Sequence, residues 1–168
     1  MGLDQGLYIK KAGKGNNKMV DVAYFRKCNQ LHGWIVRNIM DRFDNIEDLS
    51  EWNGKYVEIT KEDFNKLRSD VKEVIKKSKL RPGIIRNGFR VKEVYGSPVR
   101  VYNHEFGKKI MFKKTAKRLL PTYEGPFFGS YDYDEFYYEQ LLDIDKELDK
   151  LNDEYDLDRY KLYYWAWW

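Results

Sequence analysis

Residues 133–155, YDEFYYEQLLDIDKELDKLNDEY, carry the clearest structural signal in the chain. Apolar and aromatic side chains recur here at spacings of three and four residues, which is the period of one face of an α-helix. Asp132 and Glu135 have the spacing of a helix cap, and acids in a first turn suit the positive end of the helix dipole. The stretch therefore predicts a long acidic helix over about 132–155 with one buried seam. The seam comprises Tyr133, Tyr137, Leu141, Ile144, Leu148, Leu151 and Tyr155.

Two more principal helices are predicted upstream. Apolar side chains at helical spacing indicate one over about residues 22–41. A second is expected over about residues 61–79, because Thr60 and Asp63 form a variant of the capping box. Arg81-Pro82-Gly83 would end that helix, since proline cannot continue it.

Residues 84–114 alternate in a way that is typical of β-hairpins, with a turn expected at Gly96-Ser97-Pro98. One face of the resulting small sheet would be strongly basic. The other expected elements are a strand at 3–10, a glycine-rich loop at 11–18, an acidic loop at 44–54, a strand at 55–59 and a short helical turn at 114–120.

The fold class that follows is α+β. A chain of 168 residues is most simply one domain, here with three main helices packed on the small antiparallel hairpin sheet. No window approaches the length of apolar sequence that spans a membrane, and the N-terminus lacks the apolar core of an export signal. A single cysteine, Cys28, points to a reducing cytoplasm. We therefore expect a cytoplasmic protein with no membrane partner.

Several enzyme classes are disfavoured by what the chain lacks. Two histidines and one cysteine give no zinc-site spacing, and neither a phosphate-binding loop nor a dinucleotide fingerprint occurs. Cys28 and His32 share a helix face, but a thiol on an apolar stripe is typically buried and inert. Asp132, Asp134 and Glu135 could form an acid–base pair, although helix capping accounts for all three. We expect no cofactor and no metal, and an enzyme is the least favoured interpretation.

Charge is distributed unevenly along the sequence. Residues 76–118 hold 14 Lys or Arg against two acids, and residues 119–168 hold four against 13. The two segments could pair and cancel in the folded chain. Alternatively, they could form a bipolar surface that steers a charged partner. The sequence leaves both interpretations open.

Two regions are candidates for binding a partner. The hairpin region interleaves cations with aromatic residues, a combination that can track phosphates and stack bases. The C-terminal tail, residues 160–168, holds six aromatic side chains. It could dock into the core, or it could present an interface, since Trp and Tyr dominate binding hot spots. The candidate residues are Arg86, Arg90, Lys92, Arg100, Lys108, Lys109, Trp165, Trp167 and Trp168.

Three stretches resemble a family of small bacteriophage and prophage proteins. Members begin MGLDMYL, continue with a segment like VGYWRKANAIHKWFV and end with one like LLPTxxGFFFGSxxYDEWYxxDL. This chain has MGLDQGLYIKK at 1–11, VAYFRKCNQLHGWIV at 22–36 and LLPTYEGPFFGSYDYDEFYYEQL at 119–141. It departs from the family at Gln5-Gly6, at Cys28 and at Pro126. The resemblance covers about a third of the chain and excludes both the basic hairpin and the aromatic tail.

The resemblance implies a phage or mobile-element origin and no particular activity. It also groups polar residues of the first predicted helix with residues that precede the last one. These could line a small-ligand or anion cleft, or they could form a structural network with Arg26 or His32 paired to Asp134. The residues in question are Arg26, Lys27, Asn29, His32, Thr122, Phe127, Phe128, Ser130 and Asp134.

By analogy with small phage accessory proteins, the first expectation for function is a protein that inhibits or redirects a host protein or defence system by direct binding. The alternative is a nucleic-acid or nucleotide binder that uses the basic and aromatic hairpin. The oligomeric state stays open, because the seam of the long helix could pack internally or pair with another copy.

Overall fold

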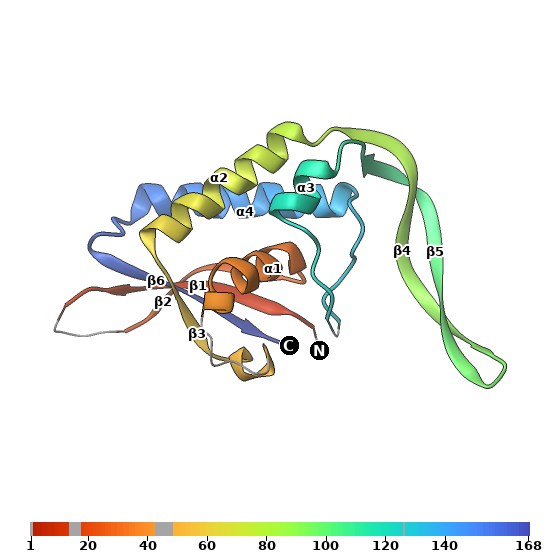
Figure 1. Ribbon diagram of the computed structural model, residues 1–168, viewed down its shortest axis with the longest axis horizontal. Coiled ribbons are helices and arrows are strands. Elements are labelled where there is room, and N and C mark those ends of the chain that lie inside the picture. Colours follow the sequence, from red (N-terminus) through yellow and green to blue (C-terminus); the bar gives the residue numbers. More distant parts are fainter. Residues whose placement is uncertain (1, 14–17, 43–48, 126) are drawn as a thin grey trace.

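The last strand of the chain, β6 (Tyr160–Trp167), lies inside a four-stranded antiparallel sheet with the strand order β2-β1-β6-β3. It pairs with β1 (Asp4–Lys11) on one side and with β3 (Tyr56–Ile59) on the other. β2 (Val20–Arg26) is the outer strand beside β1. Figure 1 shows the sheet below the helices, with the two chain ends side by side. The computed structural model describes residues 2–13, 18–42, 49–125 and 127–168.

Alternation along the strands gives the sheet one buried face. In β6, Leu162, Tyr164 and Ala166 are buried, and in β3 Val57 and Ile59 are buried. Side chains two residues apart share a face of a strand, so these residues point toward the same core. The predicted strands at 3–10 and 55–59 are confirmed. Docking of the aromatic tail is confirmed as well, because the tail is an inner strand of the sheet.

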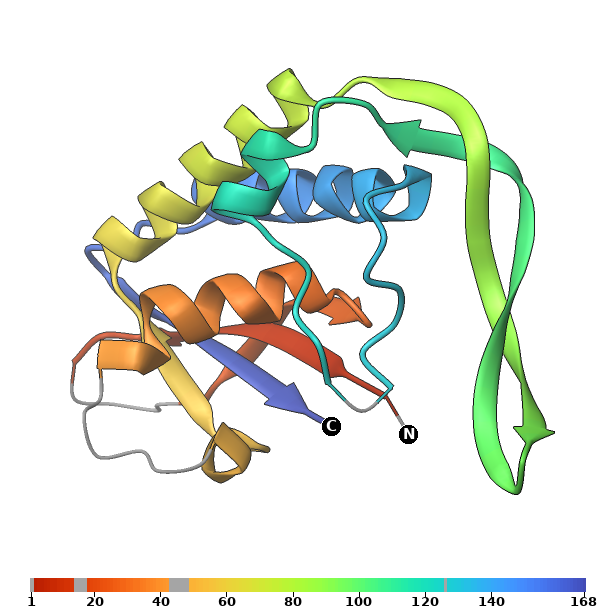
Figure 2. The same ribbon diagram turned by 45° about the vertical axis from the view of Figure 1, so that its right-hand side comes forward.

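The helices cover that face in two tiers. α1 (Asn29–Asn38) lies next to the sheet, and eight of its ten residues are buried. On its far side lie α2 (Lys61–Lys77), α3 (Lys114–Leu119) and α4 (Glu135–Glu154), as Figure 2 shows. α3 confirms the helical turn expected at 114–120.

The long helix predicted over 132–155 is confirmed as α4. Tyr137, Leu141, Ile144, Leu148 and Leu151 are buried along the predicted seam. The seam packs inside this chain, since these residues belong to the core together with those of the sheet and α1. Tyr133 and Tyr155 lie against the same core, partly buried.

The predicted cap of this helix is wrong by two residues. Asp134, rather than Asp132, is the N-cap, and its side chain accepts a hydrogen bond from the Tyr137 N–H. Asp132 instead pairs with Arg86 of the hairpin at 2.5 Å. An N-cap accepts from the second or third helical N–H, so either aspartate fits the sequence, and the ion pair decides between them.

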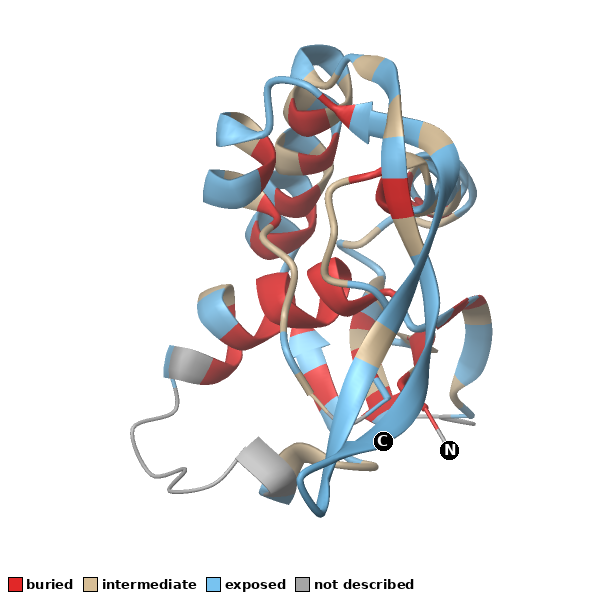
Figure 3. Ribbon diagram, turned by 90° about the vertical axis from the view of Figure 1, so that its right-hand side faces the viewer, coloured by how far each residue is buried: buried red, intermediate tan, exposed pale blue. Residues whose placement is uncertain are grey.

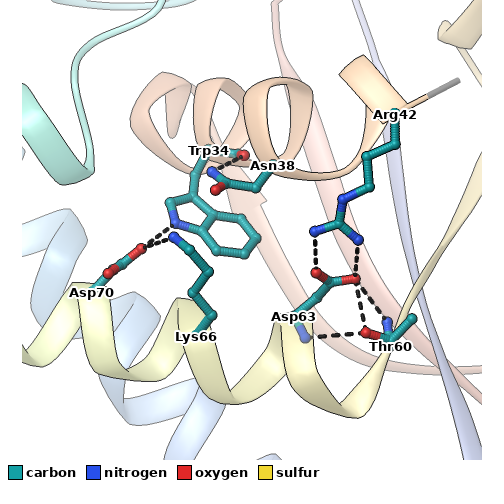
Figure 4. Close-up of polar contacts among 7 residues, drawn as sticks. All are labelled: Trp34, Asn38, Arg42, Thr60, Asp63, Lys66 and Asp70. Atoms are coloured by element: carbon teal, nitrogen blue, oxygen red, sulfur yellow. Dashed lines mark hydrogen bonds and ion pairs between the residues drawn. The ribbon is translucent and has the colours of Figure 1, made fainter. Parts of the chain in front are cut away.

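α2 begins as predicted. Thr60 accepts from the Asp63 N–H at 3.1 Å, and the Asp63 carboxylate accepts from the Thr60 N–H, which completes the capping box. Figure 4 shows that Asp63 also receives Arg42 from the 3-10 turn η1 (Met40–Arg42), while the Trp34 indole donates to Asp70. The cap therefore also fastens the end of α1 to α2.

The C-terminal end predicted for α2 is wrong. The helix stops at Lys77 with Ser78 in extended conformation, and Arg81-Pro82-Gly83 lie within the next strand. Proline fits there because it lies near the beginning of the strand. Both strands of a two-stranded sheet are edge strands, so the missing N–H of proline can face solvent there.

The helix predicted over 22–41 is also wrong in its first part. Residues 20–26 form β2, with Ala23 and Phe25 facing the core, and α1 starts at Asn29. Between them, Lys27 has a φ of 54°, which a continuous right-handed helix does not allow. Phe25 is the last inward residue of β2, and Cys28 is the residue just before α1. The two are three residues apart, which imitates helical spacing although only Cys28 adjoins a helix.

The region from 84 to 114 forms one long hairpin rather than the sheet on which the helices pack. Its strands are β4 (Leu80–Val94) and β5 (Ser97–Ile110). Tyr95 and Gly96, with φ of 51° and 78°, make the turn that was expected at 96–98. Positive φ at both residues is characteristic of the type I′ turn, which matches the twist of the strands. A second bend occurs at a bulge between Arg86 and Phe89, where Gly88 has a φ of 73°.

The described chain is thus α+β with two antiparallel sheets. The loops expected at 11–18 and 44–54 lie partly outside the described residues, and the described end of the second contains the 3-10 turn η2 (Leu49–Trp52). No helix among the described residues is long and apolar enough to cross a membrane.

Candidate functional site

His32 lies in a closed cluster of aromatic rings. Its ring centroid is 5.4 Å from that of Tyr123, 5.5 Å from Phe128, 5.0 Å from Trp168 and 6.1 Å from Tyr164. α1 contributes the histidine, the segment before α4 contributes Tyr123 and Phe128, and the end of the sheet contributes the other two. Three distant parts of the sequence therefore meet at one imidazole.

A buried hydrogen-bond chain runs from this imidazole. His32 Nδ1 lies 2.8 Å from the Tyr164 hydroxyl, which donates to Gln5 Oε1 at 2.9 Å, and Gln5 Nε2 donates to the Cys28 carbonyl at 3.1 Å. The Tyr164 proton is thus directed to Gln5, so the His32 Nδ1–H donates to Tyr164. Burial lowers the pKa of His32 to about 4 and raises the pKa of Cys28 to about 12. A neutral imidazole and a protonated thiol suit a structural role, and the inert thiol agrees with its position in the core.

Asn29 ties α1 to the segment before α4. Its Nδ2 donates to the carbonyls of Phe128 and Ser130 at 3.1 and 2.8 Å, and its Oδ1 accepts from the Tyr123 N–H at 3.1 Å. All three of these hydrogen bonds from the Asn29 side chain go to the backbone of the loop before α4. The segment is therefore held by one side chain that sequence analysis had grouped with it.

The other cleft candidates divide between this cluster and the surface. Thr122 bonds within its own loop, to Tyr131 and Tyr133. Arg26 lies on β2 and pairs with Asp4 at 3.8 Å, so its expected place on the first helix is wrong. Lys27 precedes α1 and lies against Gly129.

Asp134 does not fulfil the pairing expected for it. Neither His32 nor Arg26 bonds to it; its Oδ1 caps α4, and its buried Oδ2 has no hydrogen-bond partner among the described residues. Burial raises the pKa of this carboxyl. Phe127, two residues after Gly125, has a φ of 60° and is 66% exposed, so it points away from the ring cluster.

Two hollows in the described chain are lined by other residues. A hollow of about 480 Å³ lies between the start of α2 and the end of α4, and one of about 200 Å³ lies between β2 and α4. Neither is lined by His32 or Phe128. Asn29 and the rings around His32 thus hold the segment before α4 in place.

The hairpin is anchored at its root. Arg86 binds Asp132 through two hydrogen bonds of 2.6 and 2.5 Å, and Ile85 is buried beside them. Glu135 of α4 accepts from the Lys108 N–H at 3.2 Å, and Ile110 N–H donates to the Tyr133 carbonyl at 3.0 Å. These contacts fix the direction in which the hairpin leaves the body.

Residues 87–106, which we call the arm, project beyond this root. In Figures 1 and 2 the arm lies apart from the helices and the four-stranded sheet, and Figure 3 shows it exposed over most of its length. Phe106 is 91% exposed, Val91 is 60% exposed and Tyr95 at the tip is fully exposed. No arm residue belongs to the hydrophobic core. An isolated two-stranded hairpin is only marginally stable in water, so the arm does not stabilise the fold. Its length is therefore better explained by binding to a partner.

One face of the arm carries alternating cations and rings. The Arg100 guanidinium lies 4.7 Å from the Phe89 ring, Phe89 contacts Tyr102 edge to face, and the Arg86 guanidinium lies 4.7 Å from the Tyr102 ring. A guanidinium over a ring face is attracted by the negative charge density of that face, which is a cation–π contact. Part of the interleaving noted in the sequence is thus a physical stack, in which one arginine lies over Phe89 and one over Tyr102.

The opposite face of the arm is also cationic. Arg90 is paired with Val101 and Lys92 with Val99 in the strand register, one step out of phase with Phe89 and Val91. Successive side chains of a strand point to opposite faces, so Arg90 and Lys92 face away from the stack. Neither has an ion-pair partner within the described parts of the chain.

A second group of cations surrounds the root of the arm, and we call it the basic platform. It comes from the end of α2, from the hairpin root and from α3, and all of its side chains are exposed. Residues 76–118, which include the whole platform, contain no acid outside the arm. The platform consists of Lys76, Lys77, Lys79, Arg81, Lys108, Lys109, Lys113, Lys114, Lys117 and Arg118.

The acids of the C-terminal third do not neutralise this surface. Asp149 of α4 binds Arg68 and Lys72 of α2, and Asp145 binds Lys72 as well, at 2.7 to 2.8 Å. Of the 14 cations between residues 76 and 118, Arg86 alone has an ion pair with a described acid. Of the two interpretations of charge, the geometry therefore favours the bipolar surface.

The three tryptophans proposed for partner binding have separate environments. Trp165 is half-buried on β6, and Trp168 closes the His32 cluster while its backbone bonds the Asn53 side chain. Trp167 is 55% exposed and lies over Gly54. The alternation of β6 could have placed Tyr164 in the core, but nothing in the sequence paired it with His32.

No protein-family model, no curated protein and no solved structure matches this chain. Among the described residues, no group of three His, Cys, Asp or Glu side chains could hold a metal ion.

Proposed function

We propose that this protein binds nucleic acid through the basic platform and the arm. The observation that carries the proposal is the surface made by residues 76–118, where cations gather on neighbouring elements and, in the described chain, only Arg86 has an ion pair with an acid. Phosphate backbones bind such surfaces because each neutralised phosphate releases a condensed counterion. Two acids of α4, Asp145 and Asp149, are engaged by Arg68 and Lys72 on a different helix.

We choose a polyanion over a small nucleotide because of the size of the cationic surface. The platform spans the end of α2, the hairpin root and α3, and the arm adds cations further out. A single phosphate group would use only one part of this surface. An extended backbone can contact all of it, and the affinity then falls steeply with salt.

The test is fluorescence anisotropy with a labelled duplex of about 30 base pairs over a salt series. In the quadruple variant Lys108→Gln, Lys109→Gln, Lys113→Gln and Lys114→Gln, we expect weaker binding and a smaller salt slope, by about 0.9 for each phosphate that the variant no longer neutralises. The matched control neutralises four exposed lysines elsewhere, Lys18, Lys55, Lys146 and Lys150. Equal effects in the two variants, or no salt-dependent binding by the native chain, would refute the proposal.

A second candidate is the phage-encoded inhibitor of a host protein suggested by the family resemblance. It is favoured by exposed apolar side chains on and beside the arm, since Phe106 and Val91 lie on the arm and Met111 and Phe112 follow it. Exposed apolar patches frequently mark protein interfaces. Pull-down from a bacterial lysate, with and without the arm, tests this candidate: a stoichiometric partner captured only by the arm-bearing protein would favour it over nucleic acid.

A further inference from the structure

We infer that the arm lies in the major groove of duplex DNA, with its two faces turned toward the two phosphate strands. The inference rests on the proposed function and specifies the form of nucleic acid. It follows from where the arm's cations lie and from the width of the ribbon.

The cations occupy both faces of the ribbon. Arg100 lies with the aromatic stack, and Arg90 and Lys92 lie on the opposite side, while Arg86 at the root is engaged by Asp132. A partner with one flat acidic face would neutralise only one of these sets. A groove has phosphates along both walls, so a ribbon inserted in it meets negative charge on both faces.

Two of the arm's four rings already carry a guanidinium on one face. Arg100 lies over the Phe89 ring and Arg86 over the Tyr102 ring, each at 4.7 Å, whereas Tyr95 and Phe106 are exposed. Sequence-tolerant binders of single strands stack bases on free aromatic faces, so the choice of a duplex rests on the placement of the cations. Arg100 can donate to phosphate oxygens, while Arg86 already donates to Asp132.

The dimensions select the major groove of B-form DNA. Two strands of a ribbon are about 4.8 Å apart, and with side chains they suit a groove about 12 Å wide rather than one about 6 Å wide. The major groove of A-form RNA is too deep and narrow for side chains to read. The six residues from Phe89 to Val94 extend roughly 20 Å, so Tyr95 at the tip would lie about six base pairs from the root.

The first experiment compares labelled duplex DNA, single-stranded DNA and duplex RNA of equal length. We expect duplex DNA to bind at least about tenfold more tightly than the other two. The arm-shortened variant, in which Asn-Gly replaces residues 87–103, should reduce duplex binding to the level of the single strand. Tighter binding of the single strand or of RNA would overturn the inference.

The second experiment tests the two faces separately. Arg90→Ala with Lys92→Ala changes one face, and Arg100→Ala changes the other. Each variant should weaken duplex binding several-fold, and the two together should approach the shortened arm. If only one face matters, the arm lies on a surface and not in a groove.

The third experiment locates the arm on the DNA. Dimethyl sulfate methylates guanine N7 in the major groove and adenine N3 in the minor groove. We expect the native protein to protect guanine N7 and the arm-shortened variant to lose that protection. Protection of adenine N3 alone would place the protein in the minor groove and refute the inference.

The outcomes separate the two proposals. Salt-dependent duplex binding that is lost in the platform variant but unchanged by arm shortening keeps nucleic-acid binding by the platform and overturns the inference. Absence of any nucleic-acid binding at low salt overturns both. Sedimentation velocity adds one more outcome: if the native protein is a dimer and the arm-shortened variant a monomer, the arm binds a second copy, and the inference fails.

Discussion

At the residue scale, Asn29 makes the most concentrated set of contacts between distant segments. Its side chain satisfies two carbonyls and one N–H of the segment before α4. Leaving buried backbone groups unpaired costs about 1–3 kcal/mol each, and relaxation recovers part of this cost. We expect Asn29→Ala to lower the free energy of unfolding by about 2–4 kcal/mol, measured by urea denaturation.

Two further variants make that measurement specific. Asn29→Asp should destabilise at least as much as Asn29→Ala, because a carboxylate cannot donate to the carbonyls of Phe128 and Ser130. Asn87→Ala is the control, since its bond to Glu105 lies on the exposed arm, and it should change stability by less than about 0.5 kcal/mol. An Asn29→Ala protein as stable as the Asn87→Ala protein would show that the loop is held by its rings alone.

His32 makes stability depend on pH. Its folded pKa of about 4 lies below the ordinary 6.5 because burial disfavours the imidazolium. The unfolded chain therefore binds this proton first, so the stabilisation is complete above about pH 6.5 and is lost as the pH falls toward 4. The loss amounts to roughly 3 kcal/mol, since one pKa unit corresponds to about 1.4 kcal/mol.

The measurement is urea unfolding at pH 7, 5.5 and 4.5. His32→Gln removes the buried imidazole, so its stability should fall less over this range than that of the native chain. His104→Gln changes the exposed histidine of the arm and serves as the control. Equal pH dependence in the native and His32→Gln proteins would contradict the assignment.

Sequence reasoning anticipated part of the site at this scale. It grouped Asn29 and His32 with Phe128 and Ser130, and these residues do meet. It placed Arg26 in the same group and paired Asp134 with Arg26 or His32, because a sequence motif does not reveal which way a side chain points. The contribution of Tyr164 and Gln5 required the register of two strands that lie at opposite ends of the chain.

At the scale of elements, the arm should be separable from the fold. Its residues add nothing to the hydrophobic core, and its root is held independently by Arg86, Ile85 and Glu135. Replacing residues 87–103 with Asn-Gly joins Arg86 to His104, which already face each other across the hairpin. We expect the midpoint of thermal unfolding to stay within a few degrees of the native value.

A deeper shortening provides the contrast. Replacing residues 81–109 with Asn-Gly removes Ile85 and the Arg86–Asp132 pair, and we expect it to lower the melting temperature clearly. Calorimetry of both variants tests the boundary between root and arm. If the shorter deletion destabilises as much as the longer one, the arm is part of the folding unit.

Elements with a self-contained signal were predicted well. α2 has its capping box and α4 has a long apolar seam, so local spacing suffices for both. β2 was assigned to a helix because its inward residues continue into α1 at helical spacing, and only pairing with β1 resolves the ambiguity. The hairpin strands were expected, but their distance from the helices could not be, since alternation does not show what lies against a face.

At the scale of the whole molecule, the end of the chain holds the sheet together. β6 joins β1 to β3 and contributes Leu162, Tyr164 and Ala166 to the core. A variant that ends at Arg159 leaves β3 without a strand partner, unpairs one edge of β1 and removes Tyr164 and Trp168 from the His32 cluster. We expect it to show no cooperative unfolding transition by circular dichroism.

Lys161→Ala is the matched control for this truncation. It breaks the exposed ion pair with Glu58 on the neighbouring strand and should cost no more than about 1 kcal/mol. A truncated protein that still unfolds cooperatively near the native temperature would show that β1 and β3 are held by the helices.

The sequence by itself determined the α+β class, the seam of α4, the cap of α2 and the existence of a basic hairpin. Each of these depends on neighbours within a few residues, so spacing and charge suffice. Only the tertiary structure decided that the aromatic tail is an inner strand, that Asp145 and Asp149 of α4 are engaged by α2 and that the arm's cations have no acidic partner among the described residues. These properties depend on which distant surfaces meet, and burial and Coulomb interactions act through space rather than along the chain.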